Sequence, residues 1–234
     1  MKIQHLHSWQ VSPAQAQEMQ RRLAPQVSRR NELPNHHLIA GVDISSQSPR
    51  GLARGAVVVL RYPELTVVET ATAEAELGFP YVPGLLSFRE APLILAAFAR
   101  LYTIPHLILV DGQGIAHPRR MGLASHLGLL LDIPAIGCAK SILCGRHGPL
   151  ALEVGSQAEL VDNGEVIGVA LRTRAGTKPV YVSIGHKVDL PTAVYWVKQC
   201  CRGYRLPEPC RLAHLAAAGQ LPAKVRGRAE KTDL

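Results

Sequence analysis

Three carboxylates occupy positions where the surrounding residues predict burial. Asp43 lies within an apolar run at 38–44, Asp111 closes a second apolar run at 107–110, and Glu90 falls on the apolar face of a predicted helix. Buried carboxylates that share one region repel one another unless a divalent cation lies between them. A set of oxygen donors without paired His or Cys suits Mg²⁺ or Mn²⁺ rather than zinc. Such a site can bind phosphate and activate water for displacement at phosphorus.

Each carboxylate also has a purely structural interpretation. Asp111 could cap a turn or a helix, and Asp43 could be held by local backbone donors. The run Ser87-Phe88-Arg89-Glu90 fits a capping box, in which Glu90 bonds back to the N-cap amide. The metal-site hypothesis is favoured when the three are considered together, because two come from strands and one from a helix.

The elements that must position these residues follow from hydrophobic periodicity and turn residues. Ser12-Pro13-Ala14-Gln15 is a capping box that predicts a helix over about 12–30, as an N-terminal appendage. Three strands with short connections, and therefore antiparallel, are predicted at 37–44, 52–62 and 64–73. A helix, a strand, a second helix and a second strand follow, and this alternation predicts parallel pairing. Their expected ranges are 86–101, 106–111, 121–131 and 134–139.

The second half of the chain adds a hairpin over 160–167, because Asn163-Gly164 is a favoured two-residue turn. A further strand is predicted at 180–184 and helices at 191–201 and 208–219, with a flexible tail over about 222–234. The predicted fold class is α/β, with a mixed sheet flanked by helices. Ligands in such folds gather at the carboxyl ends of the parallel strands, where Asp43 and Asp111 are expected.

Composition limits the function classes. The 234 residues are 47% hydrophobic, enough for one core, so we expect a single domain over 1–234. The net charge of +8 favours a polyanionic partner such as nucleic acid. An apolar stretch long enough for a membrane helix and a secretory signal are both absent, which favours a cytoplasmic protein without a membrane partner. The five cysteines contain no C-x-x-C pair and predict neither a disulfide framework nor a zinc site.

Several separated motifs, in order, closely resemble the endonuclease V family, the deoxyinosine-specific nucleases. The resemblance covers about residues 38–218, and its agreement across many motifs is more specific than any lone short pattern. The motifs are Ile39-Ala40-Gly41-Val42-Asp43, Pro80-Tyr81-Val82-Pro83-Gly84-Leu85-Leu86-Ser87-Phe88-Arg89-Glu90, Val110-Asp111-Gly112-Gln113-Gly114, His117-Pro118-Arg119-Arg120, Gly137-Cys138-Ala139-Lys140-Ser141 and Leu206-Pro207-Glu208-Pro209.

The resemblance implies a ribonuclease H-like fold and Mg²⁺-dependent cleavage of the second phosphodiester on the 3′ side of a deaminated adenine. Mn²⁺ is expected to substitute for Mg²⁺. By similarity, Asp43, Glu90 and Asp111 hold the metal directly or through water, and Lys140 and His214 lie near the reacting phosphate and its water. Considered alone, Lys140 is more typical of an ordinary solvated lysine, because its motif is not a phosphate-cradling P-loop. His214 alone is equally typical of a half-exposed helix histidine.

A proline-flanked loop carries the predicted strand-separating wedge. Pro80 and Pro83 stiffen the loop around Tyr81 and Val82, so that the aromatic ring is held projecting at little entropic cost. A plain turn with a half-buried Tyr81 is the alternative. A wedge helps extrude a damaged nucleotide, and a mispaired base costs less to unstack than a paired one.

The resemblance also implies a base pocket and phosphate contacts. Leu85, Gly112, Gly122 and Leu143 are expected to line the hypoxanthine pocket, and Arg119 and Arg120 to contact phosphates, although an exposed loop pair is an alternative for the arginines. The chain departs from the family at Cys210, where the family usually has threonine. A thiol caps a helix less well than a hydroxyl, which bears on the placement of His214.

The sequence therefore predicts a monomeric, metal-dependent endonuclease acting on inosine-containing DNA. A nuclease acting mainly on inosine-containing RNA is the first alternative. A non-catalytic nucleic-acid-binding module is the second, and the three carboxylates argue against it, because a protein that only bound phosphates would gain affinity by losing them.

Overall fold

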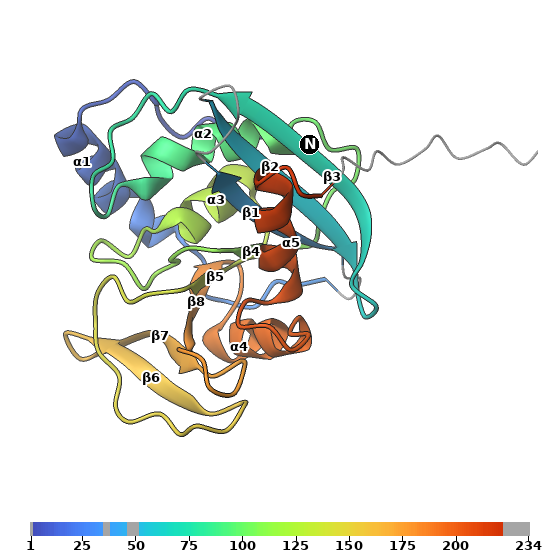
Figure 1. The fold of residues 1–234 in the computed structure, drawn as a ribbon. Coiled ribbons are helices and arrows are strands. Elements are labelled where there is room, and N and C mark those ends of the chain that lie inside the picture. The colour runs from blue at the N-terminus through green and yellow to red at the C-terminus, as the bar shows by residue number, and fades with distance from the viewer. Residues whose placement is uncertain (1, 35–37, 46–51, 222–234) are drawn as a thin grey trace, which may run out of the picture.

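A computed structural model describes residues 2–34, 38–45 and 52–221. Eight strands form one mixed sheet in the order β3-β2-β1-β4-β5-β8-β7-β6 within these ranges (Figure 1). The first four strands are β1 (Leu38–Ser45), β2 (Ala53–Arg61), β3 (Thr66–Ala75) and β4 (Leu107–Val110). The other four are β5 (Ala135–Ala139), β6 (Gln157–Asp162), β7 (Glu165–Leu171) and β8 (Val180–His186).

Strand pairing follows the sequence prediction. β1, β2 and β3 form an antiparallel meander, while β1, β4 and β5 run parallel. β8 then pairs antiparallel with β5 and begins the second meander. The turn between β6 and β7 has Asn163 at φ 51° and Gly164 at φ 81°, which confirms the predicted Asn-Gly hairpin.

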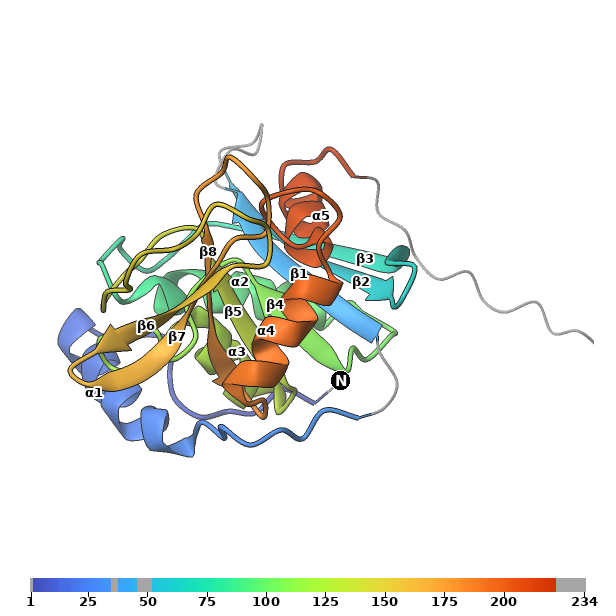
Figure 2. The ribbon, with the colours of Figure 1, turned by 90° about the horizontal axis from the view of Figure 1, so that it is seen from below.

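Helices cover both faces of the sheet (Figures 1 and 2). They are α1 (Pro13–Leu23), α2 (Leu86–Phe98), α3 (Leu123–Leu131), α4 (Leu190–Gln199) and α5 (Glu208–Ala217), with a short 3₁₀ turn at Ala24–Gln26. Side chains alternate along a strand: Ala40 on β1 packs in the core under α2 and α3, and its neighbour Ile39 packs in the core with α4. The helices and the meanders together hold β1, β4 and β5 at the centre.

The N-terminal helix is shorter than predicted. Ser12 and Gln15 form the expected capping box, but α1 ends at Leu23 instead of near Arg30. Pro25 cannot donate a backbone hydrogen bond, and the chain beyond it is extended. There the Lys187 amide donates to the Ser28 carbonyl at 2.8 Å, and the Glu32 amide donates to the Lys187 carbonyl at 3.0 Å. Tertiary pairing therefore replaces the last turns of the predicted helix.

Other boundaries differ by a few residues. α2 ends at Phe98 rather than 101, α3 begins at Leu123 after an extended Gly122, and β3 begins at Thr66 because residues 62–65 form the turn. None of the described helices is long and apolar enough to cross a membrane. The predicted tail over 222–234 and His37, the first residue of the first predicted strand, lie outside the described residues.

Candidate active site

A cavity of about 410 Å³ opens at the carboxyl ends of the central strands. Asp43 lies near the end of β1, Asp111 directly follows β4, and Lys140 directly follows β5. Because these strands are parallel neighbours, their carboxyl ends meet at one edge of the sheet. Glu90 reaches the same cavity from the beginning of α2. All three predicted carboxylates therefore line one cavity.

Asp43 is joined to the last described helix. Nδ1 of His214, on α5, lies 2.8 Å from Oδ2 of Asp43. The close approach of α5 requires Gly41, because a Cβ there would lie 1.8 Å from the carbonyl oxygen of Pro209. Cys210, which stands where the family usually has threonine, is fully buried, and α5 has no side-chain N-cap. His214 nevertheless contacts Asp43 with cysteine at this position.

Asp111 is paired with Lys140. Nζ of Lys140 lies 2.5 Å from Oδ2 of Asp111, whose side chain is almost buried. Burial raises the pKa of Asp111, and the Lys140 ammonium offsets part of that rise. Burial would by itself lower the pKa of Lys140, but its bond to Asp111 reverses this, and the pKa is raised overall. Lys140 thus brings a positive charge to the rim of the cavity and is ion-paired there, although its side chain is 45% exposed.

Glu90 has a strongly raised pKa. Burial, followed by the negative charges of Asp43 and Asp111, raises the pKa of Glu90 to about 7. The capping-box alternative is wrong, because Ser87 lies inside α2 and the N-cap is Leu85, with no side-chain hydrogen bond. Glu90 therefore presents its carboxyl group to the cavity and to two other carboxylates.

The donor chemistry of this cluster fits a divalent cation. Three carboxylates supply only oxygen donors. Burial and then repulsion from Asp43 and Asp111 raise the pKa of Glu90, and a positive ion would relieve that repulsion. As they stand, no three His, Cys, Asp or Glu side chains in the described part of the chain are close enough to form a complete metal site. His214 and Lys140 engage the two aspartates instead.

The predicted wedge loop forms one rim of the cavity. Tyr81 is 73% exposed, and it lines the cavity together with Val82 and Pro83, whereas Pro80 lines a neighbouring groove. Gly84 ends the loop at φ +78°, a conformation that favours glycine. The projecting ring agrees with the sequence prediction, and the half-buried alternative is wrong.

Three of the four predicted base-pocket residues, Gly112, Gly122 and Leu143, line the cavity. Leu85 does not: its side chain is fully buried and packs with Ala16, Phe79 and Phe88 beneath the wedge loop. The next residue, Leu86, lines the cavity instead. The prediction was displaced by one position, because side chains at successive positions near a helix start point in different directions.

Comparison with known proteins identifies the family. The family model described as Endonuclease V matches residues 21–215. An endonuclease V from Dehalococcoides mccartyi is 53% identical over 218 residues, which cover 93% of this chain and 98% of the relative. The chain belongs to the endonuclease V family. This membership confirms the resemblance predicted from the sequence, and the chain is an endonuclease.

Solved endonuclease V structures share the fold. The one from Streptomyces avermitilis is 40% identical with a TM-score of 0.84, covering 94% of this chain and 97% of that chain. A Ciona intestinalis endonuclease V in complex with a 23mer DNA containing an inosine followed by a ribo-adenosine is 29% identical with a TM-score of 0.74, covering 90% and 98%. The predicted ribonuclease H-like fold is confirmed.

The two arginines that endonuclease V resemblance assigned to phosphate are bonded within the protein. Arg119 donates from Nε to Oε1 of Gln20 at 2.6 Å and from Nη2 to the Gly84 carbonyl at 2.9 Å. Arg120 forms ion pairs with Asp162 at 2.9 Å and Glu165 at 2.7 Å. These pairs neutralise Arg120 and tie it to the β6–β7 hairpin, so its geometry favours a structural role over a phosphate contact.

Sequence reasoning gave no role to several polar residues that line the cavity of this endonuclease V site, Gln20 and His117 among them. Gln20 and His117 also line the cavity, and burial lowers the pKa of His117 to about 4. Gln20 lies in an Ala/Gln/Arg-rich helix where nothing distinguishes it from its exposed neighbours. His117 was part of a recognised motif but had no assigned role.

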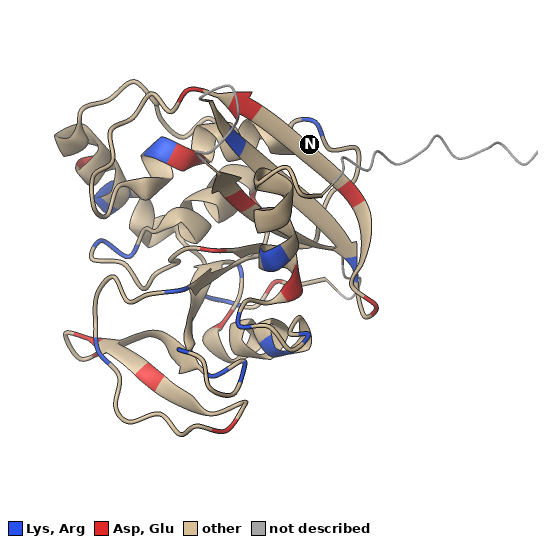
Figure 3. Cartoon of the chain, viewed as in Figure 1, with Lys and Arg blue, Asp and Glu red and all other residues tan. Residues whose placement is uncertain are grey.

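Figure 3 shows an acidic position within β1 at the middle of the sheet, with basic positions spread over the surrounding loops and helices.

Proposed function

We propose that this endonuclease hydrolyses the second phosphodiester bond on the 3′ side of inosine in DNA and leaves the base in place. The observation that carries the proposal is one cavity that holds three carboxylates, an ion-paired lysine and a projecting tyrosine on its rim. The first groups suit phosphate chemistry, and the last suits entry into a base stack. The inosine-containing DNA bound to the Ciona relative supports the same substrate class.

Asp43, Glu90 and Asp111 are the residues that would hold a divalent cation, with Mg²⁺ as the proposed ion and Mn²⁺ as a substitute. When bound, such an ion supplies polarisation of the phosphate and stabilisation of the charge that develops in the transition state. Burial and the two neighbouring aspartates raise the pKa of Glu90 to about 7, and a bound cation would favour its ionised form.

The contact between His214 and Asp43 supports a proposed role for His214 in orienting water. The carboxylate of Asp43 only accepts hydrogen bonds, so Nδ1 of His214 carries the proton in their 2.8 Å contact. In the neutral ring, Nε2 is then an acceptor, and the side chain is 56% exposed. We propose that this nitrogen accepts a hydrogen bond from the attacking water.

Lys140 places a positive charge where the phosphate would enter. Its ammonium is held by Asp111, so little side-chain freedom is lost when it meets a phosphate oxygen. It would bind the phosphate and stabilise the negative charge that grows on it during hydrolysis.

Recognition is proposed to use the loop Pro80–Pro83 as a wedge and the cavity for the extruded base. Gly112, Gly122 and Leu143 are joined by Leu86 in place of Leu85 as the proposed base-pocket residues. Glycine backbone amides and carbonyls can approach the edge of a base closely. A single chain carries the whole cavity, which supports action as a monomer, and we propose a cytoplasmic location.

Activity on inosine-containing RNA is the second candidate function. The Ciona complex contains a ribo-adenosine directly after the inosine, and this favours tolerance of a 2′-hydroxyl at that position in that protein. Oligonucleotides matched in sequence and differing only in 2′-hydroxyls would separate the two substrates.

A nicking assay tests the proposal. An end-labelled duplex with one inosine is incubated with and without Mg²⁺, beside a duplex with adenine at the same position. We expect one nick at the second 3′ phosphodiester only with inosine and Mg²⁺. Tight binding without nicking under any divalent ion would support the non-catalytic alternative instead.

A further inference from the structure

A buried glutamine of α1 reaches into the active site. Gln20 is 1% exposed, and a buried amide is costly unless its donors and acceptor are used. Its Nε2 donates to the carbonyls of Gly84 and Met121, each at 3.0 Å, and its Oε1 accepts from Nε of Arg119 at 2.6 Å. All three partners are distant in sequence, so this side chain joins α1 to two separate segments of the site.

The Gly84 carbonyl is the centre of this arrangement. Besides Gln20, it accepts from Nε2 of His117 at 2.9 Å and from Nη2 of Arg119 at 2.9 Å. Burial keeps His117 neutral by lowering its pKa to about 4, so one ring nitrogen donates while Nδ1 accepts from the Arg119 amide at 3.1 Å. Three donors, one of them charged, fix the direction of a single carbonyl at the end of the wedge loop.

The two carbonyls that accept from Gln20 lie next to the wedge loop and next to the wall of the cavity, respectively. Gly84 follows the wedge residue Tyr81 by three positions, across the rigid Pro83. Met121 directly precedes Gly122, which lines the cavity and is the N-cap residue of α3. One amide group therefore bonds both to the segment that carries the projecting ring and to the segment that forms a wall of the cavity.

We propose that Gln20, with Arg119 and His117, is a positioning residue that holds the wedge in register with the base pocket and so determines how well inosine is extracted from a duplex. This inference rests on the proposed function and adds to it residues that act through the Gly84 and Met121 carbonyls. It also gives Arg119 an internal role, because both of its bonded groups, Nε and Nη2, point to this network.

The test compares a duplex with a single strand. In single-stranded DNA the inosine needs no extraction, so a fault in wedge placement lowers cleavage of the duplex alone, whereas general damage lowers both. Gln20→Met keeps the length and packing of the side chain but removes all three hydrogen bonds. We expect kcat/KM to fall about tenfold on an inosine duplex and less than about threefold on the same strand alone, since misplacement by about 1 Å has effects of this order or larger.

Gln17→Met is the matched control, because Gln17 lies on the same helix and is only partly buried. It should change neither value. A duplex labelled with 2-aminopurine beside the inosine gives a second readout, because the fluorescence of this base rises when it unstacks. The fluorescence rise on protein binding should be smaller with Gln20→Met and unchanged with Gln17→Met. Equal losses on both substrates, or no loss in a folded Gln20→Met protein, would overturn the inference.

Arg119→Lys keeps the positive charge but loses the forked bonds to Gln20 and Gly84. We expect the same duplex-selective loss, and this variant supplies the comparison if Gln20→Met does not fold. If Arg119 instead contacts phosphate, the lysine should retain most activity, and any loss should be equal on both substrates. A wild-type protein that nicks neither inosine substrate would refute the proposed function, whereas equal losses in the variants would refute only the positioning role.

Discussion

Nδ1 of His214 lies 2.8 Å from Oδ2 of Asp43, although the two residues are 171 positions apart. The contact joins the last described helix to the first strand, so the active site is complete only when α5 has docked on the sheet. Gly41 makes this docking possible, because it leaves room for the Pro209 carbonyl against β1. The position of one catalytic candidate thus depends on a glycine that touches no substrate.

Gly41→Ala should separate α5 from β1. The added Cβ would overlap the Pro209 carbonyl at 1.8 Å, so the helix must shift and His214 must move away from Asp43. We expect a loss of about 1–3 kcal/mol in the free energy of unfolding and at least a tenfold loss of cleavage. Thermal unfolding and the nicking assay measure the two effects. Gly148→Ala is the control, since nothing lies within 4 Å of its Cβ position, and normal cleavage by Gly41→Ala would contradict this account.

Asp43→Ala should separate cleavage from binding. The substitution removes a carboxylate proposed to hold the divalent ion, so we expect cleavage to fall at least a hundredfold. Affinity for an inosine duplex should persist or increase, because a negative charge beside the phosphate has been lost. Gel-shift titration and single-turnover nicking give the two values, with the exposed Glu153→Ala as the control. Parallel losses of both would mean that Asp43 is structural.

The central sheet could be predicted from local sequence because its signals are local. Short connections specify the antiparallel strands β1 to β3, and the alternation of strands and helices specifies the parallel pairing of β4 with β1 and β5. The end of α1 could not be predicted in this way. Residues beyond Leu23 leave the helix to pair with Lys187, and no local pattern reveals a partner so far along the chain.

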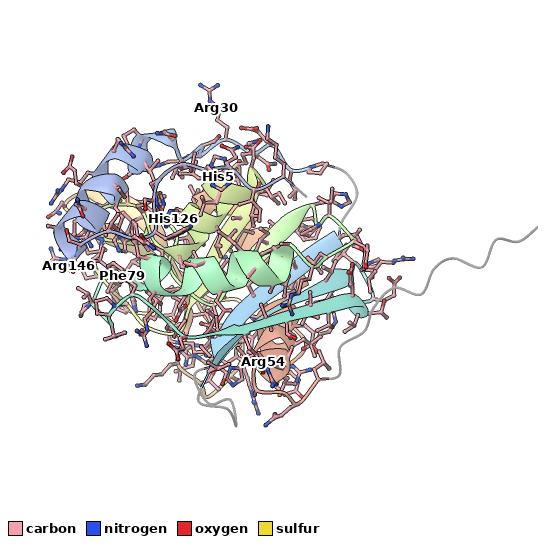
Figure 4. All side chains as sticks on the ribbon, turned by 90° about the horizontal axis from the view of Figure 1, so that it is seen from above. His5, Arg30, Arg54, Phe79, His126 and Arg146 are labelled. Atoms are coloured by element: carbon pink, nitrogen blue, oxygen red, sulfur yellow. The ribbon has the colours of Figure 1, made fainter. Side chains whose placement is uncertain are left out.

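The buried His126 and its partly buried partner His7 lead to a prediction about the pH dependence of stability. Nε2 of His7 lies 2.7 Å from Nε2 of His126, which is fully buried and lies beside Phe88. His126 is labelled in Figure 4. Burial, and then His7, lowers the pKa of His126 to about 3 from 6.5. In the unfolded chain His126 therefore binds a proton as the pH falls through 6.5, whereas in the folded protein it stays neutral until the pH nears 3. The stability that His126 contributes is present above pH 6.5 and is lost as the pH falls toward 3.

Between pH 7 and pH 5 this loss amounts to about 2 kcal/mol in the free energy of unfolding. Denaturant titrations at several pH values should show it in the wild type. His126→Phe, whose ring packs among the same aromatic side chains, should flatten the curve by that amount, whereas the exposed His5→Gln should not. An unchanged slope in His126→Phe would mean that the pair does not control acid stability.

Site residues could be predicted where their chemical type is unusual for their sequence surroundings. They could not be predicted where their role depends on how distant segments pack together. Carboxylates such as Asp43 and Glu90 are unusual in apolar surroundings, and this anomaly is visible in the sequence. Gln20 carries no such mark, because its burial depends on how α1 lies against Gly84 and Met121. Arg120 shows the converse: its motif pointed to phosphate, but the β6–β7 hairpin supplies two carboxylates that neutralise it.

Tyr81→Ala should weaken discrimination between inosine and normal bases in duplex DNA. The ring is 73% exposed at the rim of the cavity, where a side chain that only stabilised the fold would be buried. Stacking of one base on an aromatic ring is worth about 1–3 kcal/mol, so we expect the ratio of kcat/KM for inosine and adenine duplexes to fall about tenfold or more. Tyr81→Phe keeps the ring and should retain the ratio, which isolates stacking from the hydroxyl. Because the side chain is largely solvated, thermal stability should change little in both variants. An unchanged inosine preference in Tyr81→Ala would remove the wedge role and leave recognition to the cavity alone.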